Sequence, residues 1–130
     1  AIPGLSAAAS AAGLASGYAK LERDLATWDD RQRHLFTPPS SYRFDRTFRK
    51  DCSFGFDTMV DLESFGIPVG SQDTWGHLGF YGSSIACVDR ERSMSWSLIL
   101  CGYMFDSIAD ELRRNSIVDA IVYDLENLCS

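Results

Sequence analysis

The sequence lacks most of the features that assign a function directly. Its longest apolar run, around Ser97 to Cys101, is far short of the ~20 residues that a membrane-spanning helix needs. No glycine-rich phosphate-binding motif follows a predicted strand, so no nucleotide site is indicated. Basic residues are also few: 12 Lys and Arg stand against 18 Asp and Glu, a net charge of −6. An acidic surface repels phosphate, which disfavours nucleic acid as a partner.

The cysteines and histidines also lack the spacing that is typical of metal sites. The four cysteines form no C-x-x-C pair, which excludes the usual zinc and thioredoxin-like motifs. Their even number permits two disulfides, but Cys87 and Cys101 lie in apolar, strand-like runs that favour buried free thiols. The two histidines are far apart and have no paired carboxylates nearby. We therefore expect no metal and no cofactor. The compartment stays open, because the cysteines permit either disulfides or free thiols. No signal peptide is predicted, because the Ala-rich start lacks a basic region ahead of an apolar one.

The residues that are present are typical of one globular domain spanning 1–130, with 45% hydrophobic and 23% charged residues. Residues 5–27 are predicted to form a helix that Ser6 caps. Apolar side chains recur there every three or four positions, at Leu14, Tyr18, Leu21 and Leu25. Gly13, Gly17 and the neighbouring alanines predict close packing against another element.

Residues 29–52 are polar and contain "TPPSS", whose two prolines exclude a helix at that point, so this segment is predicted to be a connector. Its basic cluster (Arg43, Arg46, Arg49 and Lys50) is interpreted as a solvated face. Residues 53–104 are predicted to form antiparallel strands over 53–62, 74–82, 83–92 and 94–104, with a turn at 65–73. The charged "DRER" at 89–92 predicts the turn of a hairpin.

Residues 106–128 are predicted to form a closing helix capped by Asp106 or Ser107, with Asn115 as a candidate kink. The face expected to be buried comprises Ile108, Leu112, Ile117, Ile121, Leu125 and Leu128, and the face expected in water comprises Asp110, Glu111, Arg113 and Arg114. The predicted fold is α+β, with an antiparallel sheet of three to four strands flanked by an N-terminal and a C-terminal helix.

One stretch, "GHLGFYGSSIACVDRERSMSWSLILCGYM", resembles the C-terminal part of the serine β-lactamase and penicillin-binding-protein superfamily, on its class C and esterase branch. That branch carries G-H-x-G-[FA]-x-G-[ST] on a strand, then a turn such as D-P-E-R, then an apolar strand. The matching residues are Gly76, His77, Gly79, Phe80, Gly82 and Ser83, followed by Asp89–Arg92 and Ser97–Leu100. Arg90 replaces the proline, and Cys101-Gly102 replaces the usual Thr-Asn. The Ala-rich helix is also similar, so the resemblance covers nearly the whole chain, but only 76–92 is specific.

The resemblance implies a β-lactamase-like transpeptidase fold and a role for each motif residue. His77 would accept or relay a proton near the nucleophile, and the backbone N–H of Phe80 would bind the oxyanion. The implied substrate-lining positions are Gly76, Leu78, Gly79 and Gly82, where the glycines would let the substrate approach. Leu78 stands where Thr or Ser is common, which favours an ester, amide or peptide over a penicillin. Other interpretations stay open: His77 as a structural residue in a half-buried strand, His34 on the surface, and Trp75 and Trp96 as core or pocket wall.

The catalytic motifs of that superfamily, Ser-x-x-Lys and Tyr-x-Asn or Ser-x-Asn, occur nowhere in these 130 residues. We therefore expect an incomplete domain, whose partner is the N-terminal portion of the same protein or another protein chain. It would be a cleaved or split enzyme, an ordered fragment, or a catalytically inactive relative serving as a subunit of a larger assembly. A small independent binding domain is a third, less favoured class. An isolated C-terminal part would expose a strand edge and an apolar face. The expected partners also include a small acyl substrate if the protein is active, but no nucleic acid and no membrane span.

Overall fold

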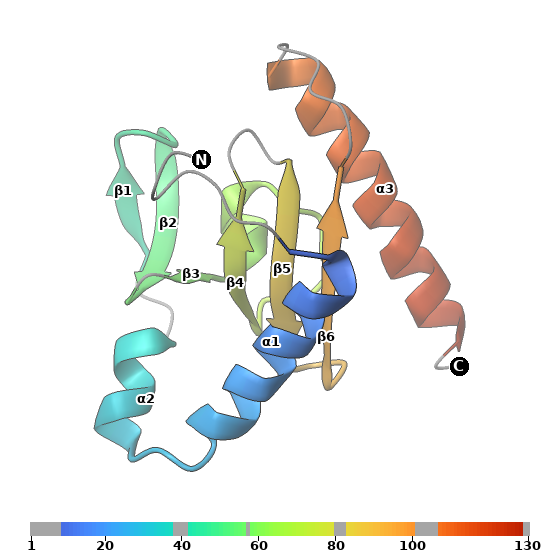
Figure 1. The fold of residues 1–130 in the computed structure, drawn as a ribbon. Coiled ribbons are helices and arrows are strands. Elements are labelled where there is room, and N and C mark those ends of the chain that lie inside the picture. The colour runs from blue at the N-terminus through green and yellow to red at the C-terminus, as the bar shows by residue number, and fades with distance from the viewer. Residues whose placement is uncertain (1–8, 38–41, 57, 80–82, 101–106, 129–130) are drawn as a thin grey trace.

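Six short strands pair in sequence order and form one antiparallel sheet in the computed structural model, which describes residues 9–37, 42–56, 58–79, 83–100 and 107–128 (Figure 1). Within those ranges the elements are α1 (Ala11–Leu25), α2 (Asp30–Phe36), β1 (Arg43–Asp45), β2 (Lys50–Gly55), β3 (Thr58–Val60), the 3-10 helix η1 (Leu62–Phe65), β4 (Thr74–Leu78), β5 (Ser84–Asp89), β6 (Met94–Ile99) and α3 (Ser107–Leu128). The fold is therefore α+β, as predicted.

The sheet is a meander in which each strand pairs with its neighbours in the chain. The predicted hairpin is confirmed: β5 and β6 pair over their whole length, from Ser84↔Ile99 to Asp89↔Met94. The prediction of three to four strands was too low. The predicted strand over 53–62 contains the end of β2 and all of β3, which pair with each other from Ser53↔Val60 to Gly55↔Thr58. An alternating apolar pattern does not reveal a tight turn inside it.

The connector predicted over 29–52 is also ordered structure. It contains α2, whose start is fixed by a capping box between Asp29 and Gln32, and the hairpin formed by β1 and β2. The hydroxyl of Thr58 donates a hydrogen bond to the Phe36 carbonyl, which joins the end of α2 to β3. The two prolines, Pro38 and Pro39, lie outside the described residues.

Helices cover both faces of the sheet. On one face, α1 and α2 pack over a cluster around Leu25, Trp75 and Val88. On the other face, η1 and α3 enclose a larger core that includes Leu62, Phe65, Ile67, Ile85, Cys87 and Val118. Side chains alternate between the faces because successive residues of a strand point in opposite directions. Trp75 is only 1% exposed, which confirms it as a core residue.

Helix α1 begins later than predicted. The Oγ of Ser10 accepts a hydrogen bond from the Gly13 backbone N–H at 3.0 Å, so Ser10 is the cap, and Ser6 lies outside the described residues. The predicted close neighbour exists, since β6 serines donate hydrogen bonds to helix carbonyls, Ser95 to Ala15 and Ser97 to Ala11. Small alanines make this approach possible.

The glycines of α1 were wrongly given that packing role. A Cβ added to Gly17 would meet nothing within 4 Å, and one added to Gly13 would meet only the capping Oγ of Ser10. Both therefore lie away from the contact with β6, and at Gly17 a larger residue has room.

Helix α3 spans the predicted range and has no break at Asn115, whose side chain donates a hydrogen bond to the Gly66 carbonyl at 3.2 Å. Its buried face was predicted wrongly at the N-terminal end, whereas Ile117, Ile121 and Leu125 of the predicted face are partly buried. Val118 is fully buried, whereas Ile108 and Leu112 are 69% and 64% exposed. Val118 and Val122, one helical turn apart, pack on the segment that follows η1. Val122 lies beside Gly70 of that segment.

Arg114 shares this buried stripe, although it was predicted to face water. It is 6% exposed and donates a hydrogen bond to the Asn115 side chain, with Glu111 at 3.7 Å. Burial lowers the pKa of Arg114, and the charge of Glu111 partly offsets this. The side chains of Ser107, Asp110 and Leu128, and all of Asp106, lie outside the description.

Candidate functional site

The predicted site residues that the structure describes are Gly76, His77, Leu78 and Gly79, and they lie at the end of β4 or directly after it. Toward β5, the strand is paired along its whole length, from Thr74↔Asp89 to Leu78↔Ile85. Toward β3, the pairs between described residues are Met59↔Gly76 and Val60↔Trp75. No described strand therefore pairs with His77 and Leu78 on that side, and we name these two residues the open half of β4.

His77 is exposed and points to the face that α1 and α2 cover, because it is two residues from Trp75 on the same strand. Its imidazole has no hydrogen bond or ion pair with any described residue. The ring is thus accessible to a ligand or to another chain. The sequence left open a half-buried structural role for His77, and the exposure of the ring does not fit that role.

Leu78 points the other way and packs against the core beneath α3. Its side chain and the imidazole of His77 therefore cannot line the same small pocket. A ligand lying along the open half of β4 would meet the backbone of Leu78 and the side chain of His77.

Contacts within the sheet can explain the glycines of the motif without a substrate. A Cβ on Gly76 would come within 2.2 Å of the Ala86 carbonyl oxygen, and one on Gly79 within 2.3 Å of the Ser84 Oγ. Close approach of β5 therefore requires glycine at position 76, whether or not a substrate binds, whereas at position 79 the nearest atom is a serine hydroxyl that can rotate away. Phe80 and Gly82, the implied oxyanion donor and a substrate-lining position, lie outside the described residues.

Neither described cysteine is suited to act as the nucleophile. Cys52 and Cys87 are buried free thiols, as predicted for Cys87, and Cys101 is outside the described residues. Burial raises the pKa of both thiols, and the nearby Asp89 carboxylate raises that of Cys87 further. Because the thiolate is the reactive form, both groups are inert at neutral pH.

The segment treated as a connector contributes a hollow that the sequence reasoning missed. A depression of about 440 Å³ lies between α2 and the β1–β2 hairpin, lined by His34, Leu35, Arg43, Phe44, Asp45, Cys52, Phe54 and Gly55. His34 is exposed, as predicted. The sequence feature that could have predicted the hairpin is the run "YRFDRTFRKDCSFGF". Aromatic and basic residues alternate there, and alternation of apolar and polar residues is typical of a strand.

A second depression, of about 520 Å³, is acidic and lies beside the segment after η1. Its charged lining residues are Glu63, Asp73 and Glu91. Among the residues that the structure describes, no group of three or more His, Cys, Asp or Glu side chains is arranged to hold a metal ion.

These features define an α+β protein whose open antiparallel sheet packs against the N-terminal helix. No protein family model, curated protein or solved structure matches the chain. None of the described helices is long and apolar enough to cross a membrane.

Proposed function

We propose that this chain is the C-terminal portion of a serine hydrolase related to β-lactamases and penicillin-binding proteins, acting on an ester, amide or peptide. The observation that carries the proposal is the exposed imidazole of His77 on the open half of β4, within a motif resembling that of the class C and esterase branch. The order of helix, antiparallel meander and helix supports it.

The proposed chemistry is acyl transfer. A serine on another part of the protein, within Ser-x-x-Lys, attacks the substrate's acyl carbonyl and gives up its hydroxyl proton to a neighbouring base. The tetrahedral oxyanion accepts a hydrogen bond from the backbone N–H of Phe80. The alcohol or amine then leaves with a proton, and water releases the acyl group from the serine. His77 accepts or relays protons in these steps, because a neutral imidazole has one nitrogen that donates and one that accepts a hydrogen bond.

The open half of β4 suits this role because no described strand pairs with it on the β3 side, next to the imidazole. An extended acyl or peptide substrate can pair with such an edge as an additional strand. Leu78 then contributes only its backbone, since its side chain packs in the core.

The alternative is a catalytically inactive β-lactamase-like subunit of a larger assembly. Two observations favour it: Ser-x-x-Lys is absent from the 130 residues, and no described residue orients the His77 ring by a hydrogen bond. A general base is normally held in place by such a partner.

An active-site probe separates the two. The tagged chain, purified with its partners from native material, is treated with a fluorophosphonate, and labelled polypeptides are identified by mass spectrometry. We expect labelling of a serine within Ser-x-x-Lys on a polypeptide bound to this chain. His77→Ala should slow labelling at least about tenfold while the partner still co-purifies.

His34→Ala is the matched control, because it removes the other histidine, which is also exposed. It should leave the labelling rate unchanged. A complex that carries no probe-reactive serine would overturn the enzyme proposal and support the inactive subunit. Equal rates for the two histidine variants would overturn the role of His77.

A further inference from the structure

The β1–β2 hairpin concentrates positive charge on an acidic protein. Residues 42–50 contain four basic side chains and one acidic side chain, a net charge of +3. Since the whole chain carries −6, the remainder carries −9. The cations are Arg43 on β1, Arg46 and Arg49 in the turn, and Lys50 at the start of β2.

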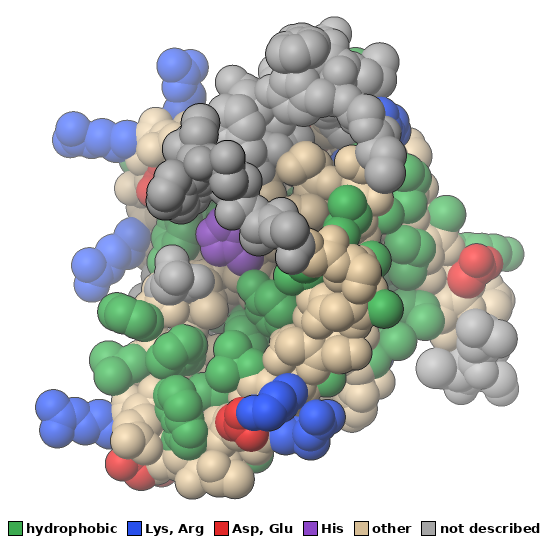
Figure 2. Space-filling model, in the orientation of Figure 1, with side chains coloured by type: hydrophobic (Ala, Val, Ile, Leu, Met, Phe, Trp, Pro, Cys, Tyr) green, Lys and Arg blue, Asp and Glu red, His purple; other side chains and the backbone are tan. Residues whose placement is uncertain are grey.

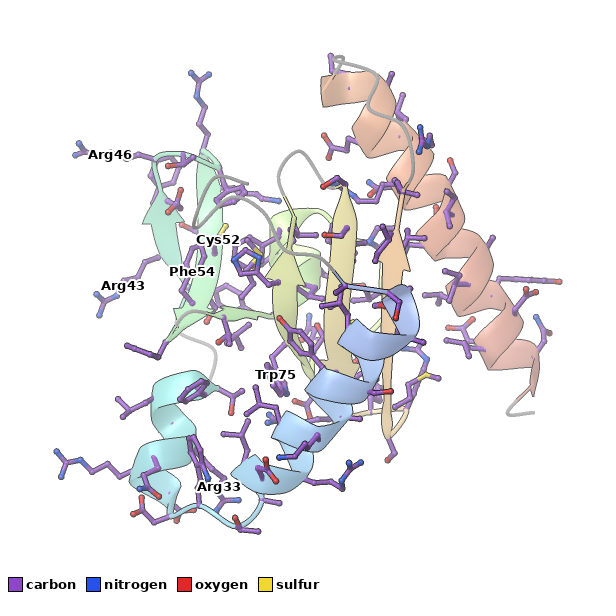
Figure 3. All side chains as sticks on the ribbon, viewed as in Figure 1. Arg33, Arg43, Arg46, Cys52, Phe54 and Trp75 are labelled. Atoms are coloured by element: carbon purple, nitrogen blue, oxygen red, sulfur yellow. The ribbon has the colours of Figure 1, made fainter. Side chains whose placement is uncertain are left out.

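These cations are not used for internal pairing. Among the described residues, none of the four has an ion-pair partner, whereas Arg33, Arg90, Arg92 and Arg114 elsewhere in the chain each lie within 4 Å of a carboxylate. Arg43, Arg46 and Arg49 are exposed. Figure 3 shows Arg43 and Arg46 projecting outward from the hairpin on the same side.

Exposed phenylalanines accompany the charges on both faces of the ribbon. Phe44 pairs with Asp51 across the hairpin and is 66% exposed on one face. Phe54, two residues from Cys52, lies on the opposite face, where it is 45% exposed and packs edge-on to the buried Phe65 with ring centroids 4.9 Å apart. Phe48 in the turn is 39% exposed, although it packs edge-on to Phe65. We name Arg43, Phe44, Arg46, Phe48, Arg49 and Phe54 the hairpin surface.

Hydrophobic side chains also gather on the visible face near this hairpin and α2, and Lys and Arg side chains extend beyond them at the edge of the molecule (Figure 2). Rings and cations thus occupy one projecting end of the sheet. Phe44 and Phe54 also both line the depression between α2 and the hairpin, so the two rings border the same end of the molecule.

We propose that the hairpin surface binds an anionic lipid surface. A lipid interface can surround both faces of a projecting ribbon, so that Phe44 and Phe54 enter the boundary between headgroups and acyl chains together. Guanidinium groups at the same level pair with lipid phosphates, which suit their planar donor geometry. The acidic remainder of the chain is repelled, which orients the protein with the hairpin toward the lipid. This association is peripheral and does not depend on the proposed hydrolase activity.

Vesicle flotation of the complete 130-residue chain tests the proposal. Vesicles contain phosphatidylcholine alone or with about 30 mol % phosphatidylserine, a content that gives a strongly negative surface. We expect the chain to float with the anionic vesicles only, and the bound fraction to fall as salt rises from about 0.1 M to 0.5 M. A bound fraction that is the same for both kinds of vesicle, or that does not change with salt concentration, would overturn the proposal.

Matched variants locate the contact. Arg43→Glu with Arg46→Glu should weaken partitioning at least about tenfold. Arg23→Glu with Arg31→Glu makes the same change in net charge at exposed arginines of α1 and α2 and should have a much smaller effect. An equal loss in the two pairs would show a response to total charge and overturn the assignment.

The rings are tested separately. Phe44→Ala should reduce vesicle binding several-fold while Leu112→Ala, which removes a similarly exposed side chain of α3, should not. Far-ultraviolet circular dichroism confirms that each variant is folded. No vesicle binding, together with salt-sensitive binding to poly-glutamate, would overturn the lipid proposal in favour of an acidic protein partner.

Discussion

The Glu22 carboxylate on α1 binds the Arg90 guanidinium in the β5–β6 turn through two hydrogen bonds, Nε to Oε1 at 2.8 Å and Nη2 to Oε2 at 3.0 Å. The Trp75 indole N–H donates to the same carboxylate at 3.0 Å. Burial lowers the pKa of Arg90, but hydrogen bonds and the charge of Glu22 more than offset this, so the net shift is upward. One carboxylate thus fixes α1 against β4 and the turn beyond β5.

This clamp should stabilise the fold more than an ordinary surface pair. We expect Glu22→Ala to lower the free energy of unfolding by about 1–2 kcal/mol, because it also leaves the Trp75 donor unpaired. A double-mutant cycle with Arg90→Ala should give a coupling of about 1 kcal/mol in urea unfolding. The control cycle uses Lys20 and Asp24, whose side chains are 70% and 48% exposed, and should give less than about 0.5 kcal/mol. Equal coupling in the two cycles would contradict the prediction.

Two glycines should respond to alanine in opposite directions. Gly17→Ala should stabilise the chain by up to about 1 kcal/mol, because alanine favours a helix and the new Cβ meets nothing within 4 Å. Gly76→Ala should destabilise it by about 3 kcal/mol, because its Cβ would lie 2.2 Å from the Ala86 carbonyl oxygen. Thermal melts of the two variants check this. A tolerated Gly76→Ala would show that β4 and β5 can separate, and the glycine would then require another explanation.

The buried face of α3 can be tested by removing side chains of unequal size. Val118→Ala should cost about 2 kcal/mol of unfolding free energy, because the valine is fully buried. Leu112→Ala removes a larger side chain but should change stability by less than about 0.5 kcal/mol, since that residue is 64% exposed. Urea unfolding monitored by tryptophan fluorescence measures both. A larger loss of stability in Leu112→Ala than in Val118→Ala would contradict this prediction and support the buried face predicted from the sequence.

Stability should fall at alkaline pH through Cys87. Burial and then the Asp89 charge raise the pKa of this thiol in the folded chain. Below the unfolded pKa of about 8.5 both states are protonated and the contribution is constant. Above it the unfolded chain loses a proton that the folded chain keeps, so the free energy of unfolding declines by up to about 1.4 kcal/mol per pH unit. Urea unfolding in reducing buffer between about pH 7.5 and 9.5 measures the slope.

Cys87→Ala is the control for that slope. It lowers stability at every pH by removing a buried side chain, but it should also flatten the decline above the thiol pKa. An unchanged slope in the variant would assign the pH dependence to other groups.

The sequence predicted correctly those elements whose position depends on neighbouring residues in the chain. The β5–β6 hairpin followed from two apolar runs around a charged turn, and the range of α3 from its periodicity. The buried face of α3 could not be predicted in this way, because Val118 and Ile117 fit almost equally periodic stripes. The choice between them depends on the segment near Gly66 and Gly70, which lies about 50 residues earlier in the chain.

The candidate site also combines a feature that the local sequence predicted with features that depend on other parts of the chain. The sequence singled out His77, but it could not show which residues of β4 pair with β3, because that depends on the register between two separate strands. The hairpin in the predicted connector was missed because charged residues outnumber apolar ones there. Its strand pattern consists of aromatic residues alternating with arginines, and these aromatics are exposed instead of buried.

The last strand, β6, should make this chain associate with itself. It pairs with β5 on one side, and no described strand covers its other edge. The Leu100 N–H points toward β5, where it donates to the Ser83 carbonyl, so the N–H of Ile99 points to the open edge. Open edges pair with other strands unless charge prevents it. We expect multi-angle light scattering to give a mass that rises with concentration, and Ile99→Lys to restore the 14.5 kDa monomer.

Tyr123→Lys is the control for that variant, because it places the same charge on an exposed position of α3 and should leave the association unchanged. If the two variants behaved alike, association would depend on net charge instead of the strand edge. A wild-type chain that stayed monomeric at every concentration and melted in one sharp transition would show that the β6 edge needs no partner. The proposal of a hydrolase portion completed by another polypeptide would then lose a main structural reason, because the open strand edge would need no second polypeptide for stability.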